Sequence, residues 1–170
     1  MDVRIIFAIS VLTSFGGALV AARFYVWPWL RTRIRRQALG WLVAPHMILR
    51  FIGLSFLVHG VVSPALPAGF AVPAAYGDLV AGILAIGAAI GLARGTSWSI
   101  PMVWLFNIWG AADLIFAFVE GGRTKLDPQA LGAAFYLPTA IVPALLVSHI
   151  LIFALLVRGD GTADREAKRA

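Results

Sequence analysis

The stretch over residues 41–63 is apolar enough to cross a bilayer, yet it contains His46, Arg50 and His59. About 20 helical residues span a hydrocarbon core of about 30 Å, and this stretch has that length. An ionisable side chain is costly in hydrocarbon, so each of the three is expected to face protein or trapped water. The sequence therefore predicts a membrane-crossing helix with a polar inner face.

The composition extends this interpretation to the whole chain. Of its 170 residues, 61% are hydrophobic and 13% are charged, whereas soluble proteins average about 25% charged residues. At roughly 25 to 30 residues per span and loop, this length allows about five helices. We therefore expect an all-α, multi-pass bundle of five transmembrane helices in one domain over residues 1–158, followed by a short charged tail over 159–170.

Several classes of protein are excluded by what the sequence lacks. There is no cysteine, and hence no disulfide or thiolate metal site. A glycine-rich phosphate loop and a Gly-x-Ser-x-Gly elbow are also absent, which argues against the common soluble enzymes. The formal charge of +6 is not expected to serve nucleic acid, because basic residues in so apolar a chain set topology and contact anionic lipids. The expected partners are the lipid bilayer and other membrane proteins or further copies of this chain.

Five apolar segments are predicted to form the helices, over residues 3–26, 41–63, 74–94, 99–120 and 130–157. Between the first two lies a cluster of four arginines that is expected to lie on the lipid headgroups as a short surface helix. These are Arg31, Arg33, Arg35 and Arg36.

The basic residues also predict an orientation. Of 14 lysines and arginines, Arg4, Arg123 and Lys125 lie on one side of the predicted membrane, Arg50 lies within a span, and the remaining ten lie on the other side. Loops that stay in the cytoplasm are enriched in Lys and Arg. We therefore expect an inner-membrane protein with its amino terminus outside and its carboxyl terminus in the cytoplasm.

The polar residues inside the spans are predicted to lie at two depths, because a helix rises 1.5 Å per residue. The cytoplasmic half is expected to contain His46, Arg50 and His149. The outer half is expected to contain His59, Asp78, Asp113 and Tyr136, and Asn107 is expected near the middle of the membrane. These five residues are candidates for a ligand site or a proton path.

Two interpretations of the inner level stay open. His46 and His149 come from different helices and could be the axial ligands of a b-type haem, with Arg50 near a propionate. Alternatively, each histidine forms a hydrogen bond to a neighbouring helix.

The outer level is similarly open. His59, Asp78 and Asp113 come from three helices and could bind a divalent cation or form a proton relay. No compact ligand spacing identifies a metal. In the structural alternative, one carboxylate pairs with Arg50 or His59 and the other caps free backbone groups.

The run Phe106-Asn107-Ile108-Trp109 in a chain of five expected spans loosely resembles the tryptophan-rich sensory and translocator proteins. The resemblance covers this run alone, and no residue role is carried over from it.

Taken together, these features predict a non-enzymatic membrane protein. It would bind a small or apolar ligand, conduct protons or a small solute through a polar interior, or act as an accessory subunit of a membrane complex. The alternatives are a haem-binding redox protein and an intramembrane enzyme acting on lipid, with His59 and Asp78 or Asp113 as acid and base.

Overall fold

The protein is described here by a computed structural model covering residues 2–158, which contain helices and no β-strand. Five of its helical segments are long and apolar enough to cross a membrane, so the predicted number of candidate spans is confirmed. The predicted charged tail lies outside the described residues.

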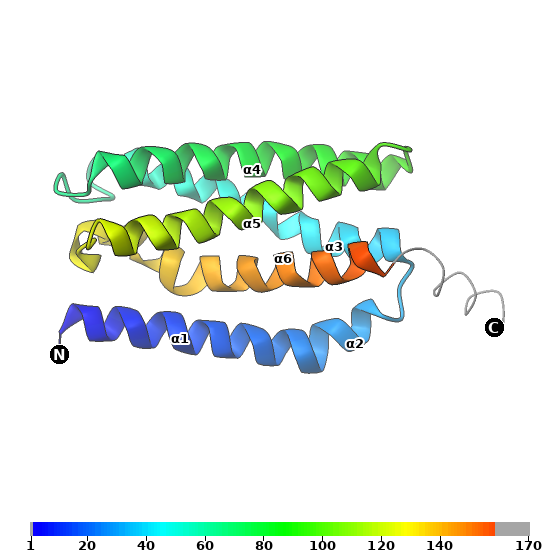
Figure 1. Ribbon diagram of the computed structural model, residues 1–170, viewed down its shortest axis with the longest axis horizontal. Coiled ribbons are helices and arrows are strands. Elements are labelled where there is room, and N and C mark those ends of the chain that lie inside the picture. The colour runs from blue at the N-terminus through cyan, green and yellow to red at the C-terminus, as the bar shows by residue number, and fades with distance from the viewer. Residues whose placement is uncertain (1, 159–170) are drawn as a thin grey trace.

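Figure 1 shows the five segments running side by side along the long axis of the molecule. The first consists of α1 (Val3–Ala21), η1 (Ala22–Val26) and α2 (Trp27–Leu30), and the second of α3 (Arg35–Leu49) and η2 (Arg50–Leu57). The third and fourth are α4 (Ala68–Arg94) and α5 (Ser99–Arg123). The last is preceded by η3 (Pro128–Phe135) and consists of η4 (Leu137–Ile141) and α6 (Val142–Val157).

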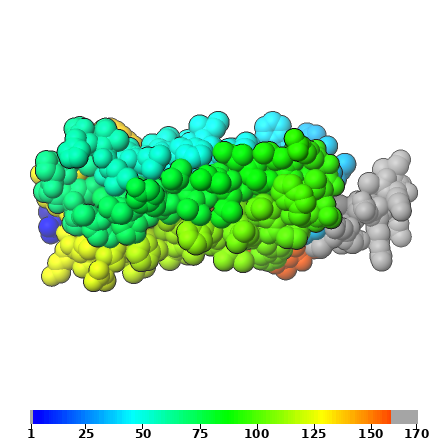
Figure 2. All heavy atoms as spheres, turned by 90° about the horizontal axis from the view of Figure 1, so that it is seen from above, coloured from blue at the N-terminus to red at the C-terminus, as the bar shows by residue number. Residues whose placement is uncertain are grey.

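The third segment, α4, lies at the centre of the tightest packing. It contacts α5, η2 and α3, and Figure 2 shows it between α3–η2 along one edge and α5 along the other. In contrast, α1 lies at the edge of the bundle beside α6 and contains no buried residue. The polar interior is therefore built by α3 to α6.

Several boundaries differ from the sequence-based prediction. The second segment begins at Arg35 instead of residue 41 and ends at Leu57. The third begins at Ala68, after Pro67 in an extended conformation. Pro73 lies within the opening turns of α4, where it removes only one early backbone hydrogen bond.

The four arginines between the first two segments do not form a separate surface helix. Arg31 and Arg33 are exposed, and the Arg33 guanidinium lies 4.9 Å from the centre of the Trp29 ring. Arg35 donates to the carbonyls of Leu155 and Leu156 at 2.9 and 2.7 Å. Leu155 and Leu156 lie in the last turn of α6, where the backbone carbonyls have no hydrogen-bond donor within the helix. A cation at this position donates to these carbonyls and complements the helix dipole.

Arg36 acts in the same way on a different helix. Its Nε donates to the carbonyl of Leu92, close to the last residue of α4. Two of the four predicted headgroup arginines therefore also join the start of α3 to the ends of α4 and α6.

Two apolar clusters occupy the opposite ends of the bundle. One contains Leu39, Phe106 and Ile152 and lies at the end where α3 starts. The other contains Phe70 and Leu131 and lies at the end where α4 starts. Between these clusters lie the buried polar residues Arg50, Asp78, Asn107 and His149.

Replacement of Arg35 by alanine should destabilise the fold more than replacement of Arg33. Arg35→Ala removes two hydrogen bonds from a charged donor to the end of α6, which are worth about 1.5–3 kcal/mol each. Thermal unfolding of the two purified variants measures this difference. Equal unfolding temperatures would show that the contacts to Leu155 and Leu156 contribute nothing, since both variants lose one positive charge.

Candidate functional site

Arg50 lies at the centre of the candidate site, at the junction of α3 and η2, with a fully buried side chain. Its Nη1 donates to Asp78 Oδ1 at 2.6 Å and to Asp113 Oδ2 at 2.9 Å. Its Nη2 donates to the Gly110 carbonyl at 2.5 Å and lies 2.9 Å from His149 Nε2. One guanidinium therefore connects α4, α5 and α6.

The network continues from His149 to Asn107. His149 Nδ1 lies 2.7 Å from Asn107 Oδ1, and Asn107 Nδ2 donates to the His149 carbonyl at 3.2 Å. Because a guanidinium can only donate, His149 Nε2 accepts from Arg50 and Nδ1 carries the proton donated to Asn107. Both ring nitrogens of His149 are thus used, and its tautomer is fixed.

His46 lies against this network. Its Nε2 is 2.6 Å from Ser148 Oγ, and its ring centre is 4.5 Å from that of His149. His46 Nδ1 is buried without a hydrogen bond in the described part of the chain.

Three glycines make room for the network. A Cβ atom at Gly53 would overlap Asp78, and one at Gly77 would overlap Asp113. At Gly110 it would lie 2.7 Å from His149 Cε1 and 2.9 Å from Arg50 Nη2. We did not predict these positions from sequence, although Gly110 lies three residues before Asp113 and so on the same helix face.

The structure joins the two predicted polar levels. Asp78 and Asp113, placed in the outer half by sequence, share Arg50 with His149, which was placed in the inner half. The structural alternative predicts that one carboxylate pairs with Arg50 while the other caps backbone groups. In the structure both carboxylates pair with Arg50.

Two predicted site residues do not belong to this network. His59 lies beyond the end of η2 and is exposed, because the second segment ends at Leu57. Tyr136 is 69% exposed between η3 and η4. Neither side chain reaches Asp78 or Asp113, so the predicted outer cluster of His59 with the two aspartates is not formed.

A haem between His46 and His149 does not fit this arrangement. The two imidazoles are in direct contact, whereas axial ligation needs an iron atom between them. Both nitrogens of His149 are also engaged by Arg50 and Asn107. Over residues 2–158, no group of three or more His, Cys, Asp or Glu side chains is placed to hold a metal ion.

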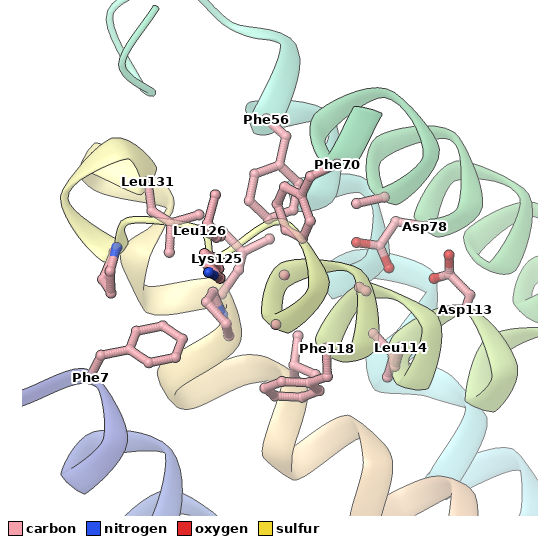
Figure 3. A pocket seen from close by; sticks show the side chains of 18 of the residues that line it. Phe7, Phe56, Phe70, Asp78, Asp113, Leu114, Phe118, Lys125, Leu126 and Leu131 are labelled. Carbon is pink, nitrogen blue, oxygen red and sulfur yellow. The ribbon is translucent and has the colours of Figure 1, made fainter. Parts of the chain in front are cut away.

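A cavity of about 460 Å³ adjoins the network. Its lining is mostly apolar and comes from α1, η2, α4, α5 and the segment that precedes α6, including Phe7, Phe56, Phe70, Leu114, Phe118 and Leu131. Figure 3 shows Asp78 and Asp113 on one side of this cavity and Phe7 and Leu131 on the other. Arg4 and Lys125 complete the lining at the end where α1 starts.

Each of the two aspartates has one oxygen that Arg50 does not use: Asp78 Oδ2 lies towards Gly53 and Asp113 Oδ1 towards Gly77, and neither glycine lines the cavity. The other oxygen of each aspartate accepts from Arg50, and within residues 2–158 neither Asp78 Oδ2 nor Asp113 Oδ1 has a hydrogen bond. Both side chains remain 9% exposed. The cavity therefore ends at two carboxylates that share one cation.

Replacement of Arg50 by methionine should strongly destabilise the protein. It leaves two buried carboxylates without a cation, and removal of one partner of a buried ion pair costs about 3–5 kcal/mol. Arg94→Met, at the exposed end of α4, should have little effect. The yield of monodisperse protein and its unfolding temperature measure the difference.

A triple variant distinguishes whether Arg50 stabilises the protein through its charge or through its shape and hydrogen bonds. Arg50→Met combined with Asp78→Asn and Asp113→Asn removes the unpaired charges and should recover stability relative to Arg50→Met alone. If the triple variant is no more stable than the single one, the arginine acts through its shape and hydrogen bonds to Gly110 and His149 instead of its charge.

Comparison with known proteins gives one match. No curated protein and no solved structure is significantly similar to the chain. Residues 6–157 match a family described as a domain of unknown function, DUF8737, and this range includes all five candidate spans except the first few residues of α1. Because the match extends over most of its length, the chain belongs to the DUF8737 family.

Proposed function

We propose that this protein spans the bacterial inner membrane five times and binds a small, mostly apolar ligand in the cavity beside Asp78 and Asp113. The observation that carries the proposal is the cavity itself. Its volume of about 460 Å³ falls within the range of about 300–1,000 Å³ typical of small-molecule sites, which are also mostly apolar with a few polar groups.

The position of the polar groups supports binding over conduction. On the side of the network away from the cavity, Leu39, Phe106 and Ile152 belong to a fully buried apolar cluster. A proton or solute pathway would need polar groups or water through this end of the bundle. The polar groups are instead concentrated at the inner end of the cavity.

The geometry does not favour the alternative of a lipid-modifying enzyme, in which His59 and an aspartate would be the acid and base. His59 is exposed in a loop, away from the carboxylates with which it would form an acid–base pair. The histidine that does lie near them, His149, has both nitrogens in hydrogen bonds to Arg50 and Asn107. Non-enzymatic binding therefore agrees best with the geometry.

A bulky side chain that fills part of the cavity should weaken ligand binding. Ala117 lines the cavity on α5, whereas the neighbouring Ala112 is exposed on the same helix and does not line it. In proteoliposomes, a diazirine-tagged dodecan-1-ol should label wild-type peptides around Phe118. Ala117→Trp should reduce this labelling about tenfold, since overpacking costs about 1–3 kcal/mol.

Ala112→Trp is the matched control and should label like the wild type. Equal labelling of all three proteins at residues around Phe118 would contradict a ligand site in the cavity. Mass spectrometry of the cross-linked peptides distinguishes the cavity from the lipid-facing surface.

The absence of native cysteine allows the proposed orientation to be tested directly. Ser97, between α4 and α5, and Gln129, in η3, are both exposed at opposite ends of the bundle. With the amino terminus outside, Gln129→Cys should react with a membrane-impermeant maleimide in intact spheroplasts. Ser97→Cys should react only after lysis, and the reverse pattern would contradict the orientation.

A further inference from the structure

Two basic side chains at the open end of the cavity have no partner within residues 2–158. Arg4, in the first turn of α1, and Lys125, just after α5, both line the cavity and are exposed. Neither side chain forms an ion pair or a hydrogen bond with another described residue.

The other charged residues at this end are engaged elsewhere. Arg123 forms a two-point contact with Glu120, at 2.8 and 2.7 Å. Asp2 accepts from the backbone of Arg4 at the start of α1, and Asp127 accepts from the backbone of Gln129 at the start of η3. Among the described residues at this end, Arg4 and Lys125 are thus the cations without an ion pair, and both line the cavity, whereas the carboxylates of Asp2 and Asp127 do not.

The backbone holds Lys125 at this position. Its φ of 49° lies in the left-handed region, which is uncommon for a residue other than glycine. The turn is closed by a hydrogen bond from the Lys125 amide to the Gly122 carbonyl at 3.1 Å. Figure 3 shows Lys125 beside Leu126 among the residues that line the cavity.

The cavity therefore has a charge gradient along its length. Its rim has Arg4 and Lys125, and its inner end has two carboxylates that share the single guanidinium of Arg50. Along α5, Asp113 lies about 15 Å from the last residue, Arg123, at 1.5 Å per residue, and Lys125 follows in the turn beyond it. An anion would be attracted to the rim and repelled from the inner end.

We infer that the ligand is a single-chain amphiphile with an anionic head, a carboxylate or a phosphate, held by Arg4 and Lys125, with its apolar chain directed towards Asp78 and Asp113. This inference rests on the proposed binding function. Phe7 and Phe118 contribute apolar surface along the path of the chain. The volume of about 460 Å³ suits a ligand of small-molecule size better than a two-chain lipid.

The preference for an anionic head group is tested with three probes that have the same alkyl chain and different head groups. Diazirine-tagged dodecanoic acid, dodecan-1-ol and dodecylamine are compared in proteoliposomes of a neutral lipid, with peptides around Phe118 as the readout. Wild-type protein should prefer the acid over the alcohol about fivefold, because the head would form two ion pairs that are exposed and therefore individually weak. The amine should label most weakly.

The variant Arg4→Gln/Lys125→Gln should lose the preference for the acid while still labelling with the alcohol. Arg123→Gln is the matched control, because it removes a positive charge from the same end at a residue paired with Glu120. It should keep the preference. Competition by unlabelled dodecyl phosphate and dodecanoate then assigns the head as phosphate or carboxylate, according to which displaces the probe at lower concentration.

The failures of the two proposals are distinguishable. Equal labelling by acid and alcohol in the wild type, or a preference that survives in Arg4→Gln/Lys125→Gln, overturns the inference about the head group and leaves cavity binding intact. If no probe labels the cavity peptides, or if labelling is unaffected by Ala117→Trp, the binding function fails and the inference fails with it.

Discussion

A single charged guanidinium in an apolar helix bundle is the constraint on which the rest of this structure depends. An isolated buried charge is strongly unfavourable, and its burial requires partners for both its charge and its donors. For the charge and both Nη atoms, Arg50 obtains them from Asp78, Asp113, Gly110 and His149, which belong to three different helices. Its Nε is buried without a hydrogen bond in the described part of the chain. The positions of α4, α5 and α6 around α3 therefore satisfy the charge and both Nη atoms of one side chain, and the glycines at the contacts allow the helices to approach it.

The same interaction determines the character of the neighbouring cavity. Two carboxylates that share one cation line the cavity where it ends. At the other end the basic side chains of Arg4 and Lys125 are free of ion pairs with described residues. The cavity is consequently apolar in its walls, with carboxylates at one end and exposed basic side chains at the other, an arrangement that would give the proposed amphiphile one preferred direction.

Much of this architecture follows from sequence, but the grouping of the polar residues does not. Hydropathy predicts the five spans, and the cost of polar groups in hydrocarbon points to Arg50, Asp78 and Asp113 as candidate site residues, although it assigns them to two separate groups. The two predicted levels are not separate, because the second segment begins at Arg35 and Arg50 therefore lies about 22 Å from its start, beside Asp78 and Asp113. The early end of η2 at Leu57 leaves His59 in a loop. The cavity depends on the packing of segments distant in sequence, which no local pattern encodes.

The ion pairs of Arg50 also bear on the order in which the bundle is assembled. A lone arginine near the middle of a helix opposes its insertion by about 2.5–3.5 kcal/mol, and the carboxylates that neutralise it follow in the next two spans. If the proposed membrane topology holds, the second segment would therefore insert poorly by itself and would be stabilised in lipid by α4 and α5. In that topology, these three helices would enter lipid most favourably as one unit, and truncation after the second segment would remove the carboxylates that pair with Arg50.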